Sequence, residues 1–357
     1  MSLFNLIQNL FRKDTPNQNV EGLIGLEKAD AIFHNLVLDK KVPGMAITVL
    51  RHGEIHFLKG YGYSDLDASI PVDPKNSIFR IASISKCITG LAFGKMVEDG
   101  TLNWDDSFYK HVPNYPKKRF DFTLRQLASH TAGIRGYRGK EYALNEPYSI
   151  EESTIVFKND PLIFEPGTGY LYNSFDFVLL SLAMQNAVGR SFEDYVRENV
   201  LLPLGMKNTS IPNGSDAHGV TEFYTKTAMG FKKAIAVNNL YKLAGGGYLS
   251  TSGDIAKMGQ AILDRRLLKK TTYDELFNAQ VIKDRSTYYG LGFQVSQDAY
   301  GRNFVGHVGN SVGAYTNFFV YPDEDIVFSI FINCTQSKVQ DDLDKAIDAI
   351  ISGNELA

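Results

Sequence analysis

Strand-forming sequence lies near both ends of this 357-residue chain, with a helix-rich stretch between the two. Residues 45–50 and 54–59 are rich in apolar and β-branched side chains, and a turn at His52-Gly53 separates them. Residues 314–321 and 326–332 form a second such pair. Each pair predicts an antiparallel hairpin, so we expect the first and last portions of the chain to supply one antiparallel sheet.

The predicted fold class is α+β, with the antiparallel sheet flanked by helices and accompanied by a mostly helical domain. We expect an N-terminal extension at 1–20, a discontinuous sheet domain at 21–100 and 244–357, and a helical domain at 101–243. A ligand site is expected in the cleft between these domains, where pockets commonly form. Helices against the sheet are predicted at 25–39, 253–263 and 341–351.

Ser83 and Lys86 are the first candidate pair for chemistry. They stand three residues apart at the start of a predicted helix that ends at Gly100, so their side chains share one face. A serine hydroxyl becomes a good nucleophile when a neighbouring group takes its proton. A lysine in a dry pocket has a lowered pKa and can accept that proton. This spacing indicates a centre for acyl transfer.

Two simpler interpretations compete with that one. Ser83 could be an ordinary helix N-cap. The spacing also occurs a second time, at Ser107 and Lys110, where nearby prolines favour a loop. The Ser83 hypothesis therefore depends on other parts of the sequence.

Two later segments supply that support: Glu165-Pro-Gly-Thr-Gly-Tyr-Leu-Tyr-Asn-Ser174 and Gly306-His-Val-Gly-Asn310. With Ser-x-x-Lys placed before them, their order resembles that of the penicillin-recognising serine hydrolases. This family contains class C β-lactamases, D,D-peptidases and related esterases and aminopeptidases, and the resemblance implies a β-lactamase/transpeptidase-like fold. Further segments that resemble sequences of this family lie at 127–133, 203–206, 244–251 and 289–292.

The resemblance implies a role for each matched residue. Tyr172 corresponds to the phenol that shares a proton with Lys86 and passes it to the leaving group, and Tyr170 is its competitor. Ser174 stands where the family usually has an amide that binds substrate. Ser174 also precedes a predicted helix at 175–188, and we favour an N-cap for it.

His307 and Gly309 match the Lys-Thr-Gly motif of most β-lactamases, with histidine in place of lysine. Histidine is mostly neutral near pH 7, so the change resembles the His-x-Gly branch of esterases, peptidases and amidases. The resemblance implies an oxyanion hole made by the backbone N–H groups of Ser83 and Asn310. Gly309, which has no Cβ, permits close approach of the backbone to a ligand.

Composition narrows the classes of function. The formal net charge is −3, without a basic cluster, so nucleic acid is not an expected partner. The two cysteines indicate no disulfide framework, and no apolar run is long enough to predict an integral membrane segment. The start of the chain has no evident signal peptide, and we expect either a short amphipathic helix or the remnant of a trimmed segment there. The compartment stays open, although the resemblance implies export in many relatives, to the periplasm or outside the cell.

These observations predict a serine hydrolase that forms a covalent acyl-enzyme on a small ester, amide or peptide. The mechanism requires no metal or organic cofactor. One alternative is a catalytically weak penicillin-binding or sensor-type protein, which the departures at Ser174 and His307 motivate. A third, less favoured hypothesis is that the protein is a true β-lactamase.

Overall fold

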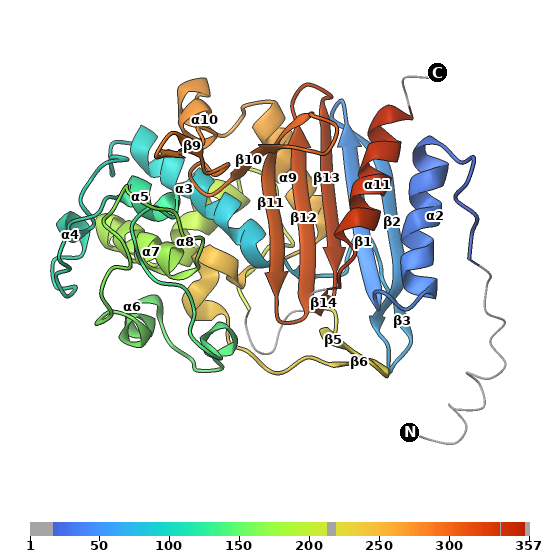
Figure 1. The fold of residues 1–357 in the computed structure, drawn as a ribbon, viewed down its shortest axis with the longest axis horizontal. Helices are drawn as coiled ribbons and strands as arrows, with labels where there is room; N and C mark the ends of the chain where they lie inside the picture. The colour runs from blue at the N-terminus through green and yellow to red at the C-terminus, as the bar shows by residue number, and fades with distance from the viewer. Residues whose placement is uncertain (1–16, 213–218, 336, 354–357) are drawn as a thin grey trace.

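A computed structural model describes residues 17–212, 219–335 and 337–353. The amphipathic helix expected at the start of the chain lies outside the described residues. Seven described strands pair antiparallel into the central sheet (Figure 1). In order across it, they are β10 (Gln294–Gln297), β11 (Asn303–Ser311), β12 (Ala314–Tyr321), β13 (Ile326–Ile332), β1 (Gly44–Arg51), β2 (Glu54–Asp65) and β3 (Ile70–Pro71).

Helices cover both faces of this sheet. Helices α2 (Gly25–Leu38) and α11 (Gln340–Ser352) pack against each other and cover one face. Helix α9 (Ser252–Leu263) packs on the other face, against β1, β12 and β13. The first and last helices of the described chain therefore lie side by side (Figure 1).

The two central strands, β13 and β1, are buried on both faces. This burial explains their nearly continuous apolar sequence. In β13, Val327 and Phe331 face the core shared with α9, whereas Phe328 and Ile330 face the core under α2 and α11. Alternate side chains of a strand point to opposite faces, so each of these strands contributes to both cores.

The remaining helices gather beyond the β10–β11 edge of the sheet (Figure 1). They are α3 (Ser85–Glu98), α4 (Phe108–His111), α5 (Leu124–Ala128), α6 (Ile150–Ser153), α7 (Phe175–Val188), α8 (Phe192–Val196) and α10 (Lys270–Leu276). Helices α3 and α7 are buried along most of their length, and they share the core that lies under α9.

Short strand pairs complete the described structure. Two of the pairs are β4 (Phe79–Arg80) with β7 (Leu249–Ser250), and β8 (Val281–Ile282) with β9 (Arg285–Ser286). A third small sheet joins β14 (Cys334–Thr335), β5 (Tyr224–Thr227) and β6 (Gly230–Lys233). Through β14 and β5, the middle of the chain pairs directly with its last portion.

The predicted α+β class is confirmed, as are both hairpins and the three helices expected against the sheet. The division into domains near residues 101 and 243 stays a prediction. Within the loop expected around Ser107, a short helix, α4, follows that residue, and Ser107 caps it by accepting a hydrogen bond from the Tyr109 N–H at 3.2 Å.

Candidate active site

Ser83 lies in a tight 3-10 turn, Ala82–Ile84, which leads directly into α3. Ser83 does not cap α3, because Ile84 occupies the N-cap position. Ala82 has a φ of +48°, a left-handed conformation that is strained for a residue with a side chain. Such strain persists only where the surroundings enforce it, and here strand β11 packs closely against the turn.

Gly309 makes this close packing possible. A Cβ at this position would meet Thr316 Oγ1 and would lie 2.8 Å from the carbonyl oxygen of Ile81. The Thr316 hydroxyl also donates a hydrogen bond to that carbonyl at 3.0 Å. Strands β11 and β12 thus hold the Ser83 turn against the edge of the sheet.

Lys86 is completely buried one helical turn after Ser83. Its Nζ donates to Ser83 Oγ at 3.2 Å and to the Gly245 carbonyl at 2.6 Å. Burial lowers the pKa of Lys86 to about 7, so near neutral pH a large share of this lysine is a neutral amine. A neutral amine at this distance can accept the Ser83 proton.

The Tyr172 hydroxyl also contacts Ser83, and it donates to Ser83 Oγ at 2.6 Å. Its ring lies 4.7 Å from Lys86 Nζ. Burial raises the pKa of Tyr172, although 38% of the residue is exposed to solvent. Tyr172 is therefore a phenol near neutral pH and a proton donor. It is Tyr172, and not Tyr170, that bonds to Ser83.

His307 lies beside this group, with its ring centroid 5.7 Å from that of Tyr172. Its Nδ1 donates to the Val308 carbonyl at 2.7 Å, so its Nε2 accepts from the Tyr289 hydroxyl at 3.1 Å. Burial lowers the pKa of His307 to about 3, which keeps the ring neutral. Both ring nitrogens are engaged within the protein, and neither is free to bind a ligand.

Three further residues, which the sequence analysis did not single out, lie beside Tyr172 and His307. They are His130, Asp176 and Tyr289. The His130 ring lies 4.6 Å from the Tyr172 ring and 4.8 Å from that of Tyr289. His130 Nδ1 lies 2.8 Å from Asp176 Oδ2, and both side chains are buried. His130 and Tyr289 lie in the segments at 127–133 and 289–292, which resemble sequences of the family. That resemblance is the sequence signal from which both residues could have been predicted.

Ser174 does not cap α7 as expected. It occupies the N-cap position, but its side chain makes no capping hydrogen bond. The Asn173 side chain caps the helix instead, since its Oδ1 accepts a hydrogen bond from the backbone N–H of Asp176 at 2.8 Å. Ser174 is thereby left to line a pocket.

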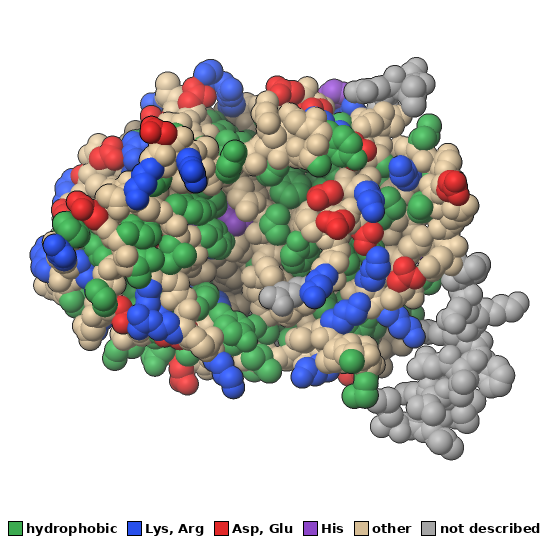
Figure 2. Space-filling model, viewed as in Figure 1, with side chains coloured by type: hydrophobic (Ala, Val, Ile, Leu, Met, Phe, Trp, Pro, Cys, Tyr) green, Lys and Arg blue, Asp and Glu red, His purple; other side chains and the backbone are tan. Residues whose placement is uncertain are grey.

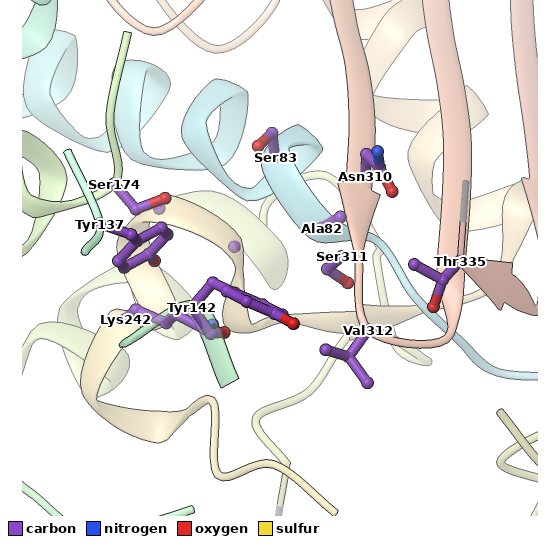
Figure 3. A pocket seen from close by; sticks show the side chains of 12 residues that line it. Ala82, Ser83, Tyr137, Tyr142, Ser174, Lys242, Asn310, Ser311, Val312 and Thr335 are labelled. Carbon is purple, nitrogen blue, oxygen red and sulfur yellow. Dashed lines mark hydrogen bonds between the residues drawn. The ribbon is translucent and has the colours of Figure 1, made fainter. Parts of the chain in front are cut away.

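That pocket, of about 250 Å³, opens beside Ser83. Ser83 lies between two walls of side chains (Figure 3). The first comes from the helical part of the chain, and the second comes from the end of β11 and the segments beside it. The space-filling view shows a hollow between the helical part and the sheet (Figure 2). The first wall is Tyr137, Tyr142, Ser174 and Lys242, and the second is Asn310, Ser311, Val312 and Thr335.

The described residues include no group of three or more His, Cys, Asp or Glu side chains arranged to hold a metal ion. Among the helices of the described ranges, none combines the length and the apolar character that crossing a membrane requires.

Comparison with known proteins places this geometry in context. A family model described as Beta-lactamase matches residues 29–351. The serine beta-lactamase-like protein LACTB, mitochondrial, of Homo sapiens is 27% identical over 400 aligned residues, covering 84% of this chain and 72% of that protein. Protein flp of Staphylococcus aureus (strain MW2) is 32% identical over 189 residues, covering 52% of this chain and 38% of flp.

Solved structures share the fold. The penicillin-binding protein homologue from Pyrococcus abyssi superposes with a TM-score of 0.77 at 24% identity, covering 87% of this chain and 74% of that one. The D-amino acid amidase from Ochrobactrum anthropi SV3, complexed with L-phenylalanine, gives 0.81 at 20% identity, covering 91% and 99%.

Proposed function

This chain belongs to the beta-lactamase family of serine hydrolases, and from that premise we propose that it hydrolyses a small ester, amide or peptide through an acyl-enzyme on Ser83. One observation carries the proposal: the Ser83 hydroxyl lies within hydrogen-bond distance of both a buried lysine and a protonated tyrosine. The first group is suited to take a proton and the second to give one.

Acylation begins when Ser83 Oγ attacks the substrate carbonyl carbon and its proton passes to the neutral amine of Lys86. The tetrahedral intermediate then collapses, and the bond between the carbonyl carbon and the leaving group breaks. Tyr172 gives its proton to the leaving group and regains one from Lys86, whose Nζ is held toward the site by the Gly245 carbonyl. Lys86 ends this half-reaction neutral.

Deacylation repeats the sequence with water. A water molecule loses a proton to Lys86 and attacks the ester carbon. The bond between that carbon and Ser83 Oγ breaks, and the serine oxygen recovers a proton from the Lys86–Tyr172 pair. The products are a carboxylic acid and free enzyme.

The developing oxyanion needs two aligned donors, each worth about 3 kcal/mol of the barrier. We assign these to the backbone N–H groups of Ser83 and Asn310. The close packing of β11 against the Ser83 turn supports this assignment, because it brings the two segments together.

The choice among substrates follows from the neutral state of His307. Efficient β-lactamases in the family usually carry a lysine there, whose charge attracts a carboxylate, and the buried imidazole supplies none. We therefore favour an esterase, amidase or peptidase over a β-lactamase. The D-amino acid amidase from Ochrobactrum anthropi SV3, which shares the fold, carries an amidase activity in its name.

A fluorophosphonate probe tests the proposal, since it forms a covalent bond with an activated serine. We expect a single adduct on Ser83 by peptide mass spectrometry, together with turnover of 4-nitrophenyl esters. Ser83→Ala should abolish both. Ser107→Ala is the matched control, because Ser107 is also followed by a lysine three residues later and caps α4. It should be labelled at Ser83 like the unmodified protein.

Other outcomes discriminate the alternatives. An adduct that forms on Ser83 without any turnover would favour a penicillin-binding or sensor-type protein. Rapid hydrolysis of nitrocefin would favour a true β-lactamase. Absence of any adduct would contradict the proposed function.

A further inference from the structure

Lys242 is the only charged side chain among the residues that line the described pocket beside Ser83. It ends a 3-10 turn at Leu240–Lys242 and is only 6% exposed. Its Nζ donates one hydrogen bond, to the Tyr142 carbonyl at 2.7 Å, and the described residues include no carboxylate paired with it. An ammonium group has three N–H donors, and two of them make no hydrogen bond within the described residues, although the group also lies 5.6 Å from the Tyr137 ring centroid.

A second cation lies close to the same pocket. Arg80 Nη1 donates to the carbonyl of Val312, a lining residue, at 2.7 Å, and the guanidinium lies 4.0 Å from the Phe223 ring centroid. Within the described ranges Arg80 has no carboxylate partner either. Lys242 and Arg80 repel each other electrostatically.

The carboxylate next in the chain to the hydrogen-bond partner of Lys242 is already engaged. Glu141 precedes Tyr142, and its two oxygens accept hydrogen bonds from Arg135 at 2.6 and 3.1 Å. The positive charge of Lys242 is therefore not neutralised by this neighbour.

Burying a cation without a counter-charge is costly. Here the cost shows as a lowered pKa of Lys242, to about 8, which burial causes and Arg80 reinforces. A bound anion would remove that cost. The rest of the pocket is suited to one, because Asn310 lines it and the Ser311 hydroxyl has no hydrogen-bond partner among the described residues.

We propose that the substrate carries a carboxylate that binds Lys242 in this pocket while its reacting carbonyl lies at Ser83. The inference rests on the proposed function and narrows its substrate class to anionic esters, amides or peptides. The charge lies on the wall opposite β11, the strand that carries His307, so the pocket attracts an anion from a position unrelated to the His-x-Gly motif.

Two esters of equal chain length test this proposal: neutral 4-nitrophenyl hexanoate and anionic mono-4-nitrophenyl adipate. A charge-assisted hydrogen bond contributes enough for about a tenfold or greater preference. We expect kcat/KM for the adipate ester to exceed that for the hexanoate ester by this factor in the unmodified protein. Lys242→Gln should bring the ratio of the two close to one, and Lys242→Arg should retain part of it.

Lys270→Gln is the matched control, because Lys270 pairs with Asp274 on the surface of α10. Its ratio should equal that of the unmodified protein. Labelling of Ser83 by the fluorophosphonate probe reports whether each variant keeps a folded site.

The experiment separates a failure of the proposed carboxylate site from a failure of the proposed hydrolase activity. If both esters are hydrolysed at similar rates by the unmodified protein, or if labelled Lys242→Gln keeps the full preference, the carboxylate site is refuted and the hydrolase remains. If neither ester is hydrolysed and Ser83 forms no adduct, the proposed function itself fails.

Discussion

At the scale of single residues, one buried amine sets the pH range of the site. Lys86 forms no ion pair within the described residues, and burial outweighs the nearby Asp176 carboxylate and lowers the pKa of Lys86 from 10.5 to about 7. Only the neutral amine can accept the Ser83 proton. Below pH 7 the fraction of neutral Lys86 falls about tenfold per pH unit, and above pH 7 it approaches one.

The rate of fluorophosphonate labelling should therefore rise with pH through a midpoint near 7 and then level off. The measurement is the second-order labelling rate between pH 5.5 and 9, with Lys86→Met as the comparison. That variant should lose about 10²-fold or more at pH 8 and should lack the same midpoint. A labelling rate that still rises about tenfold per pH unit at pH 9 would mean that Lys86 keeps its ordinary pKa. A midpoint near 7 that persists in Lys86→Met would mean that Lys86 is not the base.

The Tyr172 phenol gives a second prediction at this scale. Tyr172→Phe removes the 2.6 Å hydrogen bond to Ser83 and the proton donor for the leaving group. We expect kcat to fall about 10²–10⁴-fold on amide substrates, with a smaller change in KM. Tyr170→Phe is the control, since Tyr170 is the neighbouring tyrosine that does not contact Ser83, and it should stay within about threefold. Equal losses in the two variants would contradict the assignment.

Sequence reasoning reached Ser83, Lys86 and Tyr172 because their spacing and order form a pattern along the chain. It could not predict a role for Lys242, because that role depends on whether a carboxylate lies near the Lys242 ammonium group in space. Glu141 is 101 positions away in the sequence, and only the fold shows that Arg135 has already engaged it.

At the scale of elements, the contact between β11 and the Ser83 turn leaves no space for an added side chain at Gly309. Gly309→Ala would place a methyl group against Thr316 Oγ1 and the Ile81 carbonyl, where there is no space for it. We expect a loss of about 1–3 kcal/mol in unfolding free energy and a large loss of labelling, because β11 must move away from the turn.

Gly253→Ala is the matched control for that substitution. Gly253 lies in the first turn of α9, and an added Cβ there makes no close contact. The change should be neutral or slightly stabilising, because alanine reduces the freedom of the unfolded chain. Chemical denaturation and the labelling rate measure both variants. If Gly309→Ala behaves like Gly253→Ala, the close approach is not required.

Long elements with a uniform pattern were predicted well, and short or competing ones were not. The strands at 314–321 and 326–332 have the expected bounds, because β-branched and aromatic runs flank a clear turn. Helix α4 spans only Phe108–His111, too short to show a periodic pattern. At α7 two residues could cap the helix, and the choice of Asn173 over Ser174 follows from contacts that the sequence does not reveal.

At the scale of the whole molecule, the sheet separates two cores with different roles. The core shared by α3, α7 and α9 surrounds the segments that carry Ser83, Lys86 and Tyr172. The core under α2 and α11 lies on the other face. We therefore expect that stability can be lowered from that face without disturbing the site.

Leu343 on α11 and Leu91 on α3 are both completely buried, one in each core. Replacing either with alanine should cost about 3–5 kcal/mol, since each change leaves a cavity. Leu343→Ala should lower the melting temperature yet keep kcat/KM within about twofold at temperatures where the protein stays folded. Leu91→Ala should lower both, because it loosens the helix that holds Lys86 against Ser83. Thermal denaturation and ester hydrolysis at about 20 °C measure the pair. An equal loss of activity in both variants would show that the two cores act as one, and that the sheet transmits packing defects to the site.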